Sequence, residues 1–95
     1  MVRDFNSLQS YFRSAGVFDQ LKVEKIGVFG SLARGESFND IDILVDQSVP
    51  FEDVYKLQLK MEAELQAHVD IMIKELAEPI ILYRALKDIR YATRD

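Results

Sequence analysis

The sequence predicts an α/β (α+β) fold, in which a small mixed β-sheet carries helices packed on one face. Two short runs, residues 40–46 and 69–73, alternate apolar and polar side chains as half-buried strands do. Longer segments with apolar residues at helical spacing lie between and around these runs. The chain has 95 residues and is 48% hydrophobic, which suits one small core. We therefore interpret residues 1–95 as a single domain.

In chain order, the expected elements are a helix over residues 5–15, a turn or helical piece over 17–24, a strand over 25–30, a loop with room for one helical turn over 31–39, a strand over 40–46, a connection over 47–50, a helix over 51–67, a strand over 69–73 and a helix over 75–86. Asp4 can cap the first helix and Gly16 can end it, while Pro79 suits the first turn of the last helix. Residues 88–93 fit either a frayed helix end or a short edge strand.

Three aspartates fall on the same side of the predicted strands. Asp40 and Asp42 are two residues apart, so on a strand both point to one face, and Asp70 has the same setting in its own run. Carboxylates this close repel at roughly 4 kcal/mol per pair for an effective dielectric near 20, and a divalent cation removes that penalty. Oxygen ligands suit Mg²⁺, which binds one or two carboxylates together with substrate phosphates. The pattern therefore points to metal-assisted phosphate chemistry.

The acid-bearing face of the sheet is also partly apolar. Phe29, Leu44 and Met72 would share it with the carboxylates, and no remaining segment is expected to cover it. An exposed apolar patch rimmed by charge usually marks a partner site. We therefore expect a homodimer or a complex with another protein.

Composition excludes several classes of function. The net charge of −4 argues against direct nucleic-acid binding, although basic residues gather between Arg84 and Arg94. The absence of cysteine excludes disulfides and thiolate metal sites. No run reaches membrane-spanning length and the first residues carry no signal pattern, so a cytoplasmic protein without membrane contact is expected.

The motifs in their order resemble a known family. G-S-L-A-R-G-E at residues 30–36, D-I-D at 40–42 and V-D-I at 69–71 resemble the nucleotidyltransferase superfamily of DNA polymerase β. The likeness is greatest to its small branch, the minimal nucleotidyltransferases (MNT), which are often the antitoxin half of HEPN–MNT toxin–antitoxin pairs. It covers the chain from about residue 25 onward. The loop before Asp40 is two residues shorter than is common in that branch.

The resemblance implies a role for each of the three acids. In the family, the first two acids hold two divalent ions and the third holds one of them. Carried over, Asp40, Asp42 and Asp70 are the metal ligands and catalytic residues, with two Mg²⁺ ions expected alongside nucleotide. Asp70 would also orient or deprotonate the acceptor hydroxyl.

The glycine-serine turn is expected to bind the nucleotide. Gly30 lacks a side chain, so a triphosphate can approach its backbone, and Ser31 offers a hydroxyl and an amide to oxyanions. Arg34 could donate to phosphate, or it could simply pair with Glu36 and shape the loop. His68 is interpreted as a solvated residue at a helix C-terminus.

The family also suggests a reaction. The expected activity is Mg²⁺-dependent transfer of a nucleoside monophosphate, from ATP or another NTP, to a hydroxyl. In HEPN–MNT systems the acceptor is a tyrosine of the partner toxin, which becomes AMP-modified and inactive. One alternative is an antitoxin that masks its partner without catalysis. Another is a small-molecule nucleotidyltransferase, although such relatives usually carry a further domain for the acceptor.

Overall fold

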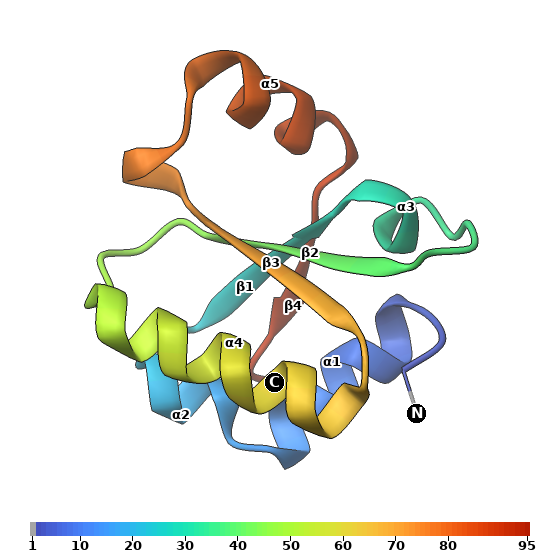
Figure 1. The fold of residues 1–95 in the computed structure, drawn as a ribbon, viewed down its shortest axis with the longest axis vertical. Helices are drawn as coiled ribbons and strands as arrows, with labels where there is room; N and C mark the ends of the chain where they lie inside the picture. Colours follow the sequence, from blue (N-terminus) through green and yellow to red (C-terminus); the bar gives the residue numbers. More distant parts are fainter. Residues whose placement is uncertain (1) are drawn as a thin grey trace.

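The computed structural model describes residues 2–95, and these form one four-stranded sheet with helices (Figure 1). The elements in chain order are α1 (Phe5–Ser14), α2 (Val17–Leu21), β1 (Lys25–Phe29), α3 (Gly30–Ala33), β2 (Asp40–Val45), α4 (Phe51–Leu65), β3 (His68–Ile73), the short 3₁₀ helix η1 (Lys74–Leu76), α5 (Pro79–Asp88) and β4 (Arg90–Thr93). The predicted fold class is thereby confirmed. The last segment, left open between a helix end and an edge strand, is an edge strand.

The sheet is mixed, and its strand order is β3-β2-β1-β4. β1 is antiparallel to both β2 and β4, whereas β2 and β3 are parallel. A parallel pair needs a crossover connection, and α4 supplies it between β2 and β3. Figure 1 shows α1, α2 and α4 gathered on one side of the sheet, with α5 at the opposite end of the molecule.

The core lies between the sheet and α1, α2 and α4. It contains apolar residues that alternate along the strands together with the inward stripes of the helices, among them Phe12, Ile26, Ile41, Ile43, Leu57, Met61 and Val69. The first helix begins as predicted, because the Asp4 side chain accepts from the Ser7 amide in a capping box. This arrangement leaves the opposite face of β2 and β3 for polar side chains.

The end of α4 positions the following strand. Gln66, the residue after α4, has a φ of 54° in the left-handed region, and its amide donates to the carbonyl of Glu62. The Glu62 side chain in turn accepts a 3.0 Å hydrogen bond from the Val69 amide. The same helical turn thus closes the helix and fixes the first residues of β3.

Replacing Gln66 by glycine should stabilise the protein. A non-glycine residue in the left-handed region costs about 1–2 kcal/mol. Glycine avoids this strain, but it loses more backbone entropy on folding, which offsets roughly 0.5–1 kcal/mol of the gain. The expected gain in unfolding free energy is therefore about 0.5–1 kcal/mol. Urea denaturation can measure it, and Gln66→Ala serves as the control that keeps the strain.

The prediction that the acid face stays uncovered was wrong in part. Leu44 is fully buried, and a Cβ added to the neighbouring Gly27 would lie 2.6 Å from Cδ1 of Ile89. Ile89, between α5 and β4, therefore packs across this part of the sheet. Phe29 and Met72 are half-buried. Glycine at position 27 leaves room for the isoleucine, a relationship that strand alternation alone does not reveal.

Exposed apolar side chains gather elsewhere on the molecule. On the outer side of α4 they are Phe51, Tyr55 and Leu59, and on η1 and α5 they are Leu76, Ile80, Ile81, Tyr83 and Leu86. Large exposed apolar groups of this kind favour contact with another protein. The candidate partner surface thus shifts from the sheet face to these helices.

The basic C-terminal segment has structural roles at several positions. Arg94 forms ion pairs with Asp19 and Glu24, and its guanidinium also donates to the carbonyl of Val23. The Arg90 guanidinium stacks over the Phe5 ring at 4.1 Å from its centroid. These contacts hold β4 against the N-terminal helices.

Candidate metal and nucleotide site

The candidate site lies on one face of the two parallel strands β2 and β3. In their register, Asp40 is opposite His68 and Asp42 is opposite Asp70. Side chains that are directly opposite in adjacent strands, or two residues further along, share a face. Four polar side chains therefore meet here, and the three carboxylates selected from the sequence are among them.

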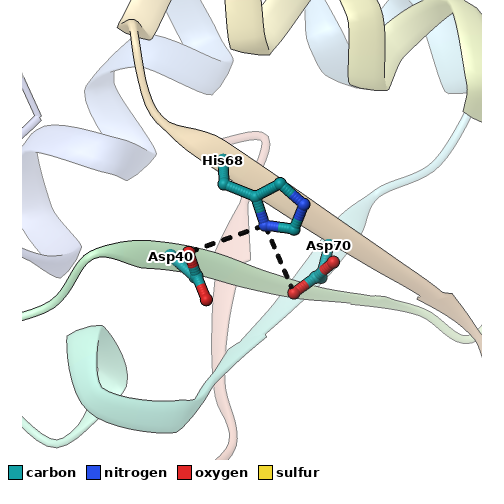
Figure 2. A group of neighbouring side chains, drawn as sticks. All are labelled: Asp40, His68 and Asp70. Carbon is teal, nitrogen blue, oxygen red and sulfur yellow. Dashed lines mark ion pairs between the residues drawn. The ribbon is translucent and has the colours of Figure 1, made fainter.

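His68 lies between two of the carboxylates (Figure 2). Its Nδ1 atom is 3.5 Å from Oδ1 of Asp40 and 3.6 Å from Oδ2 of Asp70. One ligand atom from each of these three residues lies within 4.8 Å of the others. His68 is exposed, as expected, but its placement at a helix C-terminus was wrong, because α4 ends at Leu65 and His68 is the first residue of β3. The sequence did contain a signal for its position in the site, because His68 and Asp70 are two residues apart and so share a face of a strand.

Asp42 is the least exposed of the three acids. Burial raises the pKa of its carboxyl group above the ordinary value of 3.8, and the negative charges of Asp70 and Asp40 raise it further. His68 and Arg34 act in the opposite direction with smaller effects. The site therefore carries unbalanced negative charge that an added cation would neutralise.

Gly30 lies directly against Asp42. Its φ is +75°, and a Cβ at this position would overlap Oδ2 of Asp42. Glycine is thus required twice, by the backbone conformation and by the carboxylate. Gly30 also begins the single turn of α3, which confirms the expected helical turn in the loop after β1. The glycine-serine turn and the acid face are therefore in contact.

Arg34 is already engaged in ion pairs. Its guanidinium donates to Asp88 at 2.7 Å and to Glu36 at 3.1 Å, and its third contact is the Ser31 hydroxyl at 3.3 Å. The pairing with Glu36 that the sequence allowed is present. The link to Asp88 joins α3 to α5 and places Arg34 beside the glycine-serine turn.

The donor set suits a divalent cation. Carboxylate oxygens on a shared face are the protein ligands that Mg²⁺ takes, and the imidazole adds a nitrogen donor. Asp46, in contrast, lies at the far end of β2, where it contacts Lys25 and Tyr91. It is not part of this group.

Comparison with known proteins identifies the family of this chain. Residues 8–91 match the family described as Polymerase beta, Nucleotidyltransferase. The chain belongs to this family. It is accordingly a nucleotidyltransferase, and its family characteristically acts with divalent metal. The resemblance seen in the motifs is confirmed.

Individual relatives agree with this assignment. The protein adenylyltransferase MntA of Thermococcus cleftensis is 35% identical over 81 residues, which span 77% of this chain and 78% of the relative. A solved minimal nucleotidyltransferase superposes with a TM-score of 0.65 at 24% identity, covering 93% of this chain and 95% of its own. The two chains therefore share nearly their whole fold.

A third similar structure contains a partner. It is a complex of the tri-AMPylated HEPN toxin of Shewanella oneidensis with its MNT antitoxin. The TM-score is 0.65 at 18% identity, with 93% of this chain and 71% of that chain covered.

Within residues 2–95 of the present chain, none of the helices has the length and apolar character needed to span a bilayer.

Proposed function

We propose that this chain is an antitoxin that transfers AMP from ATP to a tyrosine hydroxyl of a HEPN-type partner protein, with release of pyrophosphate. The observation that carries the proposal is the meeting of Asp42 with Asp70 across the parallel strands and with Gly30 at the turn. It brings acidic ligands beside a turn in which the backbone of Gly30 carries no side chain. The similarity to a protein adenylyltransferase supports protein as the acceptor.

Each residue would have a distinct part in this reaction. Asp40 and Asp42 would hold two divalent ions, which when bound would neutralise the triphosphate and favour ionisation of the acceptor hydroxyl. Asp70 would hold the ion on the acceptor side, and its carboxylate would orient the acceptor hydroxyl and accept its proton. The backbone at Gly30 and the hydroxyl of Ser31 would donate to phosphate oxygens. Arg34 would add a donor by exchanging its contact with Ser31 for one with phosphate.

The acceptor would come from a partner. The acid face is open beside Asp40 and Asp70, whose side chains are 54% and 55% exposed, so a second protein can reach it. The exposed apolar side chains of α4, η1 and α5 provide surface for docking. A HEPN-type protein or a second copy of this chain are the partners we propose.

The direct test is a labelling reaction. With Mg²⁺ and ATP labelled in the α-phosphate, the wild-type chain should place label on a HEPN-type protein encoded by a neighbouring gene. Substitution of the modified tyrosine by phenylalanine should remove the label. A toxin that stays unlabelled while growth is still rescued would contradict catalysis and favour neutralisation by binding.

Neutralisation by binding alone is the second candidate. The observation that favours it is the amount of exposed apolar surface on α4, η1 and α5, which could serve a stable complex without chemistry. Transfer to a small molecule is the third candidate, and a genomic neighbour that is not HEPN-like would favour it. The labelling reaction distinguishes AMP transfer from neutralisation by binding. The identity of the neighbouring gene distinguishes these two candidates from transfer to a small molecule.

Nucleotide binding should depend on Asp42. Calorimetric titration of the wild type with Mg·ATP should give a saturable signal that Asp42→Asn largely removes, since the substitution withdraws a charged ligand from the ion and its phosphates. Asp46→Asn, at the far end of the same strand, is the matched control and should bind as the wild type does. Equal signals from Asp42→Asn and the wild type would exclude Asp42 as a ligand.

A further inference from the structure

His68 was not among the ligands expected from the sequence, yet it lies within the acid cluster. We propose that His68 is a nitrogen ligand of a divalent-cation site that it forms with Asp40 and Asp70. We further infer that this nitrogen shifts the preference of the site from Mg²⁺ toward transition ions such as Mn²⁺, Co²⁺ and Zn²⁺. The inference rests on the proposed function because it concerns a metal on the same acid face.

Backbone register sets the position of the imidazole. His68 is paired directly with Asp40 and precedes Asp70 by two residues, so all three side chains leave the sheet on one side. The register of the parallel strands β2 and β3 sets this arrangement. The Val69 amide is held by Glu62, which fixes the backbone between His68 and Asp70.

The distances are close to those of a coordination shell. Ligand atoms about 2.1 Å from a tetrahedral ion are separated from one another by about 3.4 Å. The Nδ1 atom of His68 is 3.5 Å from an oxygen of Asp40 and 3.6 Å from an oxygen of Asp70. The ligand atoms of the three residues lie within 4.8 Å of one another, and all three side chains are more than half exposed, so each can rotate to bring its ligand atom to a common ion. An ion can therefore enter with little rearrangement.

The charges and donor types suggest which ion is preferred. Two carboxylates balance one divalent cation, and a neutral imidazole adds a donor without adding charge. Mg²⁺ prefers oxygen ligands and retains its waters, whereas imidazole suits the later first-row ions. A site with two oxygens and one nitrogen should therefore bind Co²⁺ or Zn²⁺ more tightly, relative to Mg²⁺, than a site with oxygens alone.

The sequence offers a clean spectroscopic probe, because His68 is the only histidine in the chain. Protein labelled with ¹⁵N-histidine gives signals from a single imidazole, and these can be followed during titration with Zn²⁺ in neutral buffer. We expect the Nδ1 resonance to move to a metal-coordinated position. Asp40→Asn should lower the Zn²⁺ affinity measured from this resonance by about tenfold or more. Loss of a residue that only supports a metal ligand already lowers metal affinity by that factor. Asp46→Asn, outside the cluster, should leave it unchanged.

A second measurement tests ion preference without relying on activity. Calorimetry gives the ratio of Co²⁺ affinity to Mg²⁺ affinity for the wild type and for His68→Asn, in which an amide oxygen replaces the nitrogen. The ratio should fall on the order of tenfold in the variant. Circular dichroism and thermal melting of the variant check that it is folded.

The outcomes separate this inference from the proposed function. An unmoved imidazole signal, or equal ion ratios for wild type and variant, overturns the role of His68 even if AMP transfer proceeds with Mg²⁺. A moved signal that is insensitive to Asp40→Asn also overturns it, because the histidine would then bind the ion alone. Coordination by His68 without any labelling of a partner supports the site and contradicts the proposed reaction.

Discussion

Asp42→Asn is expected to reduce AMP transfer by at least about 10²-fold, the scale seen when one preorganised charge-stabilising group is removed from an active site. Asp42 is the acid in contact with Gly30 and opposite Asp70, so it lies between the turn and the acceptor side. The variant should lose nucleotide binding together with transfer. The measurement is the rate of label incorporation into the partner.

Asp70→Asn separates binding from chemistry. We expect this variant to retain most of its Mg·ATP affinity and to lose transfer to the same extent as Asp42→Asn, because Asp70 serves the acceptor side. Single-turnover labelling and calorimetry on the same preparations give the two quantities. If both variants neutralise the toxin in cells as well as the wild type does, the reading as a non-catalytic antitoxin replaces the enzymatic one.

Asp42→Asn should also leave the metal-free protein at least as stable as the wild type. Burial and the charges of Asp70 and Asp40 raise the pKa of Asp42 in the folded state, so its ionised form opposes folding. Below the ordinary aspartate value of 3.8 the carboxyl is protonated in both states and this cost is absent. The difference in melting temperature should therefore grow as pH rises through the folded-state pKa. A clear loss of stability at neutral pH would mean that Asp42 is a structural partner.

Gly30→Ala is expected to have the other large effect. An added Cβ would overlap the carboxylate of Asp42, so the turn or the acid must move. Alanine at a φ of +75° also adds about 1–2 kcal/mol of strain. Misplacement of a reacting group by an ångström can cost on the order of 10²-fold in rate. We expect a loss of transfer of this size and a lower melting temperature.

Gly35 provides a matched control for that substitution. Its φ is +78°, almost the same as that of Gly30, yet a Cβ there would meet no atom within 4 Å. Gly35→Ala should therefore show the strain in its melting temperature while keeping most of the transfer activity. Equal losses of transfer in the two variants would show that contact between Gly30 and Asp42 is not what the reaction needs.

The placement of the acids could be predicted from the sequence because alternation along a strand fixes the face of every side chain. Asp40 and Asp42 differ by two positions, and the run around Asp70 has the same phase. The parallel register that brings Asp42 opposite Asp70 depends on α4 and its left-handed end at Gln66. No local pattern encodes that register, so convergence was a hypothesis until the fold was known.

The parts that were mispredicted depend on contacts between distant segments. Leu44 was assigned to an open face because no remaining segment was expected to cover it, but Ile89 does so from 45 positions away. His68 was assigned to a helix end because the helix was extended two residues beyond Leu65. The end of α4 is marked by one left-handed residue, Gln66. Glycine or asparagine usually occupies such a position, so glutamine does not signal a helix end in the sequence.

The ladder between β2 and β3 also explains how so small a chain can hold this chemistry. Neighbouring strands in any sheet are about 4.8 Å apart, so the gap between facing aspartates is set by the peptide backbone itself. Such spacing needs no tuned packing beneath it and survives changes of core residues that preserve the pairing. Residues 25–73 supply every side chain of the candidate site, and the helices outside this range, α1, α2 and α5, supply none of them.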